Sequence, residues 1–175
     1  MSRTFSNIGW VTRNDGERDQ RYTMPQVLNI DGSRDRRFGL FEQPRFGTSD
    51  ILTQGRSQYY NGTNAHSGPG VYQLMATYGY NRIKTSSLHL ILMEYANSGM
   101  SLDVNRRLDE HGRGGLDNIA TQMNQASYRG MDVRARYASA DSPFEARAQE
   151  LFLLDQRNFS WNSRNNGGID FGWWR

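Results

Sequence analysis

The chain has 175 residues, a net charge of +3 and no cysteine. This length suits one globular domain with a small appendage. The absence of cysteine excludes a disulfide framework, a thiolate metal site and a cysteine nucleophile. We expect neither a membrane span nor a secretory signal, because no apolar run approaches about 18 residues and no apolar stretch follows the first Met.

The basic residues are almost all arginine: 20 of the 21 are Arg, and Lys84 is the single lysine. A guanidinium group matches phosphate oxygens bidentately, whereas an ammonium group acts as a point charge. A GC-rich genome explains the same bias equally well. The composition is therefore compatible with nucleic-acid binding and does not establish it.

Residues 1–66 differ from the rest of the chain. They carry mixed charge, frequent glycine and few sustained apolar patterns, with short apolar segments at 26–30 and 38–41 on either side of an Asp31-Gly32 turn. We detect no internal repeat. We therefore expect an irregular N-terminal arm over 1–66, in contact with DNA or a partner, and a main domain over 67–175.

The main domain begins with two expected strands, at 71–76 and 88–95, and a glycine turn at 97–99 ends the second. A helix capped by Ser101 or Asp103 should follow and stop at 112–115. Next come a helix at 116–126 and an alternating strand at 131–137.

The last expected helix has the clearest start in the chain, because Ser142, Pro143 and Glu145 match the cap, first-turn and capping-box positions. It should run to about Gln156. We expect it to expose Glu145 and Arg147 and to bury Ala148, Leu151, Phe152 and Leu154. The whole order predicts an α+β fold with a small, mainly antiparallel three-stranded sheet flanked by helices.

Arg107 and His111 are four residues apart on the helix after the second strand, so they lie on one helical face. A guanidinium and an imidazole on the same face suit the binding of a phosphodiester. Several further residues, in order, make the chain resemble the GIY-YIG endonuclease family over roughly residues 68 to 168. The matching positions are Gly70-Val71-Tyr72, Gly99, Arg107, His111, Glu150 and Asn162 after Trp161.

The resemblance implies a divalent-metal-dependent endonuclease with Mg²⁺ (or Mn²⁺) held by Glu150. Tyr72 would be the general base or would position the water, and Arg107 would bind the scissile phosphate. His111 would hydrogen-bond the tyrosine or the phosphate, and Asn162 completes the catalytic set. These are the functions that phosphodiester hydrolysis requires: an activated water, and stabilisation of charge at the phosphate.

One position departs from the family pattern, because Asn97 stands where the family has its second tyrosine. Tyr95 shares a strand face with Asn97 by period-two geometry and is an accessory candidate. Gly99 and Lys84, which lies in the long loop between the two signatures, are further accessory candidates.

Each site residue also has a structural explanation. Tyr72 fits a packing role, Arg107 fits a surface pair with Asp103, and Glu150 fits a pair with Arg147. His111 suits a helix end, where the helix dipole favours a cation, and Asn162 suits a turn.

The expected function is cleavage of DNA rather than RNA, in a restriction-like or toxin role. Clustered Arg34, Arg36 and Arg37 in the arm would add DNA contacts. The alternative is a catalytically impaired nucleic-acid-binding module of the same fold. A nucleotide-dependent transferase is not supported, because no phosphate-binding glycine loop opens a helix.

The partners expected are nucleic acid, a second copy of the chain if the target is palindromic, and an immunity or cognate protective protein; no membrane is expected. The expected site of action is cytoplasmic, which is compatible with secretion as a toxin.

Overall fold

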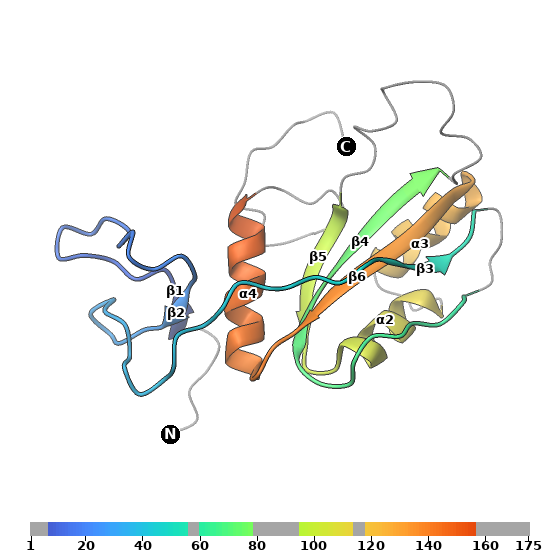
Figure 1. The fold of residues 1–175 in the computed structure, drawn as a ribbon. Coiled ribbons are helices and arrows are strands. Elements are labelled where there is room, and N and C mark those ends of the chain that lie inside the picture. Colours follow the sequence, from blue (N-terminus) through green and yellow to red (C-terminus); the bar gives the residue numbers. More distant parts are fainter. Residues whose placement is uncertain (1–6, 56–59, 79–94, 114–117, 157–175) are drawn as a thin grey trace.

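The computed structural model describes residues 7–55, 60–78, 95–113 and 118–156 (Figure 1). In chain order its elements are β1 (Ile8–Gly9), β2 (Gln26–Val27), β3 (Asp50–Thr53), β4 (Gly70–Tyr78), β5 (Tyr95–Ser101), α2 (Val104–Gly112), α3 (Asn118–Tyr128), β6 (Met131–Ser139) and α4 (Pro143–Gln156). None of the helices in these ranges has the length and apolar character needed to cross a bilayer.

The architecture is α+β, with a four-stranded antiparallel sheet in the order β3-β6-β4-β5 and a separate two-stranded sheet, β1-β2. The expectation of three strands is therefore wrong. The additional strand, β3, comes from the segment expected to be an irregular arm. Tyr137 of β6 donates a hydrogen bond to the Asp50 carboxylate of β3 at 2.7 Å, and burial together with that carboxylate raises the pKa of Tyr137 to about 12.

The turn expected at 97–99 is instead the interior of a strand. β5 runs from Tyr95 to Ser101, and Gly99 pairs with Tyr72 of β4. Asn, Ser and Gly favour turns, but pairing along β4 overrides that local preference. Of the strand expected at 88–95, Tyr95 belongs to β5, and residues 88–94 lie outside the described residues.

Helices α2 and α3 pack on one face of the large sheet. Asp103 is the N-cap of α2, and its carboxylate accepts a hydrogen bond from the Arg106 N–H at 3.1 Å. α3 spans Asn118–Tyr128 and ends two residues later than expected; its expected start at residue 116 lies outside the described residues. The core between these helices and the sheet contains Tyr72, Leu74, Ala76, Val104, Leu108, Met123, Val133 and Ala135.

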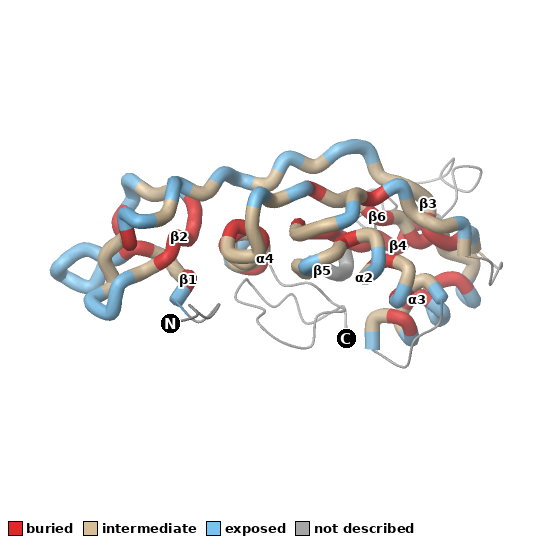
Figure 2. The backbone as a smooth tube through the Cα atoms, turned by 90° about the horizontal axis from the view of Figure 1, so that it is seen from below, coloured by how far each residue is buried: buried red, intermediate tan, exposed pale blue. Residues whose placement is uncertain are grey.

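Helix α4 is covered on two sides (Figure 2). On one side Ala148 joins a cluster with Met24 and Val27 of the N-terminal region. On the other side Leu153 joins a cluster with Val71 of β4 and Ala138 of β6. The expected burial of Ala148 and Leu154 is confirmed, while Leu151 and Phe152 are partly buried.

The start of α4 is also as expected, with the Ser142 hydroxyl accepting a hydrogen bond from the Glu145 N–H at 3.1 Å. The expected exposure of Glu145 is wrong, because this side chain is buried. Its carboxylate accepts hydrogen bonds from the N–H groups of Asp141, at 3.0 Å, and Glu42, at 3.4 Å. The second donor comes from the N-terminal region, which covers the start of the helix.

The N-terminal region contains a tandem repeat that the sequence analysis missed. Residues 11–22 and 27–38 share, at a spacing of 16 residues, a valine, an Asp-Gly turn, an Arg, an Asp, a second Arg and a terminal aromatic ring. Both form a hairpin with a positive-φ glycine, Gly16 or Gly32. In each hairpin a buried aspartate, Asp19 or Asp35, is ion-paired with the arginine two residues later.

The contact between the N-terminal region and α4 predicts an effect of substitution on stability. Met24→Ala removes a fully buried side chain from the cluster around Ala148, and we expect it to lower the free energy of unfolding by about 2–5 kcal/mol. Urea denaturation measures the change. Ile30→Ala, at a fully exposed position, is the control and should stay within about 0.5 kcal/mol of wild type. Equal stabilities for the two variants would contradict the packing described here.

The Asp19–Arg21 pair predicts an acid dependence. Hydrogen bonds from the Arg21 guanidinium lower the pKa of Asp19 to about 2, so the pair stabilises the folded state fully above about pH 4 and loses its effect as the pH falls toward 2. Arg21→Gln should bring the Asp19 pKa back toward its ordinary value. NMR titration of the carboxyl carbon measures this. Arg45→Gln serves as the control, and an unchanged Asp19 pKa in Arg21→Gln would refute the assignment.

Candidate functional site

The centre of the candidate site is a hydrogen bond between the large sheet and α2. The Tyr72 hydroxyl lies 2.8 Å from Nε2 of His111, and the two rings are tilted at 57° with centroids 5.6 Å apart. Tyr72 lies on the face of β4 that packs against α2. His111 follows Val104 and Leu108 on the buried stripe of that helix. Strand alternation and helical periodicity together bring the two side chains into contact.

Gly99 makes room for the Tyr72 ring. It is the direct partner of Tyr72 across the β4–β5 pairing, and a Cβ atom added to Gly99 would lie 2.9 Å from the tyrosine oxygen and 3.1 Å from Cζ. From the sequence, this glycine was expected to lie in a turn. Its role in the structure is steric: it leaves the space that the phenol group occupies.

Glu150 is anchored next to Gly99. Its Oε2 accepts a hydrogen bond from the N–H of Met100 at 2.8 Å, and its Oε1 is ion-paired with Arg147. The side chain of Glu150 is 13% exposed. Tyr72 and Glu150 therefore meet neighbouring residues of β5 from opposite faces of the sheet: Tyr72 lies against Gly99 on the face that packs on α2, and Glu150 reaches Met100 from α4 on the other face. The Glu150–Arg147 pair considered from the sequence is present.

Arg107 lies at the edge of this group. It is one helical turn before His111, its side chain is 38% exposed, and Nη1 lies 3.1 Å from the Glu110 carboxylate. The partner considered from the sequence, Asp103, instead caps the helix. The side chain of Arg107 is therefore exposed enough to contact a phosphate group of a ligand in solvent, whereas His111 is buried.

The accessory residues are only partly placed. Asn97 pairs with Leu74, and Tyr95 pairs with Met75, with a register shift between the two pairs. Lys84 and Asn162 lie outside the described residues.

Tyr60 supports the end of α2, and the sequence did not predict this contact. Its hydroxyl donates a hydrogen bond to the Asp109 carboxylate at 2.6 Å, and its ring lies over Gly112 at the end of α2. Burial, and secondarily Asp109, raises the pKa of this phenol well above its usual range. Tyr60 thus holds the turn of α2 that carries His111. No local pattern marks it, because it belongs to a loop-like stretch 49 residues from Asp109.

The described residues fit a magnesium site that has a single protein carboxylate. In the described ranges, no three His, Asp or Glu side chains gather into a metal-binding group. Glu150, the carboxylate that the family resemblance implies as the ligand, would be a single protein ligand, and Mg²⁺ is commonly held by one or two carboxylates with water and substrate oxygens. Arg147 neutralises this carboxylate, so a cation at Glu150 would have to displace the guanidinium.

Comparison of the chain with protein-family models, with curated proteins and with solved structures finds no match. The family resemblance noted from the sequence therefore stays a prediction, and the function has to be argued from the geometry.

Gly99→Ala should disrupt the centre of the site. The added Cβ would push the Tyr72 hydroxyl away from His111, and we expect a loss of about 1–3 kcal/mol in the free energy of unfolding. Urea denaturation and the ¹⁵N chemical shifts of the His111 ring measure the two effects. Gly47→Ala, where an added Cβ meets nothing within 4 Å, is the matched control. Unchanged His111 shifts in Gly99→Ala would show that the ring can move without breaking the bond.

Proposed function

We propose that this chain is a divalent-metal-dependent endonuclease that hydrolyses phosphodiester bonds, with DNA as the preferred substrate. The observation that supports this most directly is the Tyr72–His111 hydrogen bond beside Gly99, with Glu150 held on the next residue of β5. A pair able to exchange a proton and a carboxylate able to hold a metal ion are two requirements of this reaction. The exposed Arg107 supplies a third, a cation for the phosphate.

Tyr72 acts on the attacking water in this proposal. A free phenol has a pKa of about 10 and is a poor base at neutral pH. In the tautomer whose Nε2 is unprotonated, His111 accepts the phenol proton, and the tyrosine oxygen then takes a proton from water. Arg107 exchanges its contact with Glu110 for a bidentate contact with the substrate phosphate.

Glu150 is the residue that would hold Mg²⁺ or Mn²⁺, and a bound ion would neutralise charge on the phosphate. Without the ion, Arg147 balances the carboxylate. The biological role consistent with this activity is restriction or a nuclease toxin. A palindromic target would require a two-fold dimer, and either role would require a protective partner.

A second candidate is a nucleic-acid-binding module of the same fold without catalysis. It is favoured by the burial of Tyr72 and His111, which are 4% and 1% exposed. Asn97 at the position of the family's second tyrosine favours it too. The two candidates differ in whether the phosphodiester bond breaks.

Nicking of a supercoiled plasmid in Mg²⁺ tests the proposal. We expect wild type to nick the plasmid, and Glu150→Gln to lower the rate by about 10²–10⁴-fold, as loss of an essential catalytic group does. Arg147→Gln is the matched control, because it breaks the same ion pair but leaves the carboxylate in place. We expect it to retain cleavage.

A second matched pair lies on α2. Arg107→Ala should abolish nicking, whereas Arg106→Ala, which removes a 71%-exposed arginine beside it, should not. Equal losses in Glu150→Gln and Arg147→Gln would assign the ion pair a structural role only. An intact plasmid with wild type would exclude the endonuclease and leave the binding module.

A further inference from the structure

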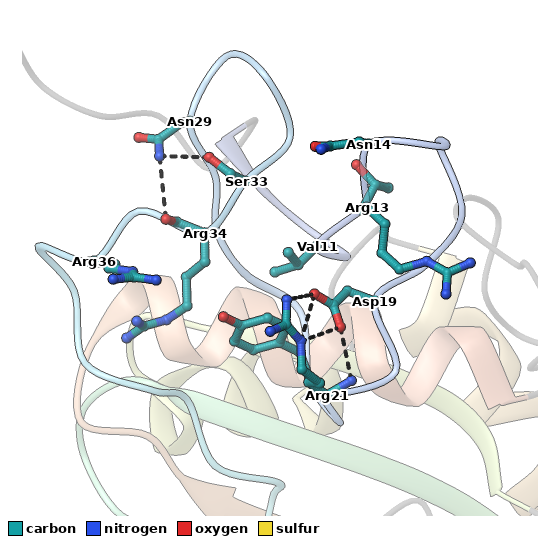
Figure 3. Close-up of a pocket in the computed structure, with 11 residues that line it drawn as sticks. Val11, Arg13, Asn14, Asp19, Arg21, Asn29, Ser33, Arg34 and Arg36 are labelled. Carbon is teal, nitrogen blue, oxygen red and sulfur yellow. Dashed lines mark hydrogen bonds and ion pairs between the residues drawn. The ribbon is translucent and has the colours of Figure 1, made fainter.

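The tandem hairpins enclose a groove far from Tyr72 in the sequence. The first hairpin contributes Arg13, Asp19 and Arg21 to its walls, and the second contributes Arg34 and Arg36. Figure 3 shows the Asp19–Arg21 pair in the middle of the groove, with Arg34 and Arg36 on one side of it and Arg13 on the other. Four guanidinium groups from two repeated units therefore share one concave surface.

The acidic groups of the hairpins leave this surface positively charged. Among the described residues that line the groove, Asp19 has the only carboxylate, and this carboxylate accepts hydrogen bonds from Arg21. Asp15 pairs with Arg13 on the solvent side. Among the described residues, Arg34 and Arg36 have no carboxylate partner, and the buried Nε of Arg34 has no hydrogen-bond acceptor. Two cations of the groove are thus uncompensated.

The spacing of the arginines over two hairpins suits a ligand with repeated negative charges better than a single small anion. Arg13 and Arg21 have side chains 54% and 83% exposed, and Arg36 is also exposed. Exposed guanidinium groups from both hairpins suit the repeated charges of a phosphodiester backbone. Contacts of this kind position a protein on nucleic acid without reading its sequence.

The hairpins are also fixed relative to the candidate site. Arg18 stacks on Trp10, 3.7 Å from the ring centroid, and makes two hydrogen bonds of 3.1 Å to Asp155 at the end of α4. Asp155 lies five residues after Glu150, a rise of about 7.5 Å along the helix. A nucleic acid held in the groove would therefore lie at a defined place relative to that carboxylate.

We propose that the groove between the tandem hairpins binds the phosphate backbone of nucleic acid. The inference extends the proposed function by adding a second contact for the same substrate, but binding can be measured without cleavage. It assigns a function to the N-terminal repeat, whose Asp–Arg pairs otherwise only stabilise the hairpins.

Fluorescence anisotropy with a short labelled DNA duplex in EDTA, over a series of salt concentrations, tests this inference on the full chain. Arg36→Gln should weaken binding several-fold and reduce the slope of log K against log salt by about 1, since one phosphate contact is lost. Arg34→Gln/Arg36→Gln should reduce the slope by about 2. Arg36 makes no described contact that folding needs, so the single variant stays informative if the double variant unfolds.

Arg45→Gln removes the same charge from an 89%-exposed site outside the groove and is the matched control. If Arg36→Gln binds DNA as Arg45→Gln does, the inference is overturned, even if the plasmid is nicked. If it weakens binding while the plasmid stays intact, the groove is supported and the endonuclease is not. Polyglutamate that competes as well as unlabelled DNA at equal charge would overturn the assignment in favour of an acidic protein partner.

Discussion

The fold depends on the burial of α4 on two sides. A helix that is apolar on opposite faces cannot lie on the surface of a single sheet, because one face would stay in water. Here the large sheet covers Leu153, and the N-terminal hairpins cover Ala148. Glu150 lies between these two contacts along the helix, so its position is set by both layers. Loosening either layer would move the carboxylate relative to β5.

The segment Gly99-Met100 joins the two faces of the large sheet. Gly99 faces Tyr72 on the side of α2, whereas the Met100 side chain packs with Val71 on the side of α4. The Met100 N–H reaches Glu150. A side chain at position 99 would push out the phenol ring. Glycine is thus required at position 99, because the contact with Tyr72 and the contact of Met100 with Glu150 fall on adjacent residues of β5.

The sequence predicted the elements that carry local signals. The cap of α2, expected at Ser101 or Asp103 and found at Asp103, the start of α4 at Ser142 and the alternation in β6 were all recognisable. β3 was missed because four residues carry too little periodicity, and Gly99 was misread because its partner strand decides its conformation.

The candidate site also has parts that local sequence signals predict and parts that only the fold reveals. Helical spacing placed Arg107 and His111 on one helix, but the contact of His111 with Tyr72 spans 39 residues and only the fold reveals it. The repeat in the N-terminal region was also missed, because its shared positions serve ion pairs and turns rather than a continuous apolar pattern. The partly buried hydrogen bond between Tyr60 and Asp109 is marked by no pattern in the sequence around either residue.

The hairpins have a consequence for folding order. Their contacts, such as Val11 with Asp19 and Val27 with Asp35, span a few residues and therefore form early and fast. The helix that covers their apolar side is synthesised more than a hundred residues later. On the ribosome the N-terminal region emerges before the helix that covers it, and we expect Met24 and Val27 to stay exposed to water until α4 emerges. Slow elongation before α4 would prolong this exposure.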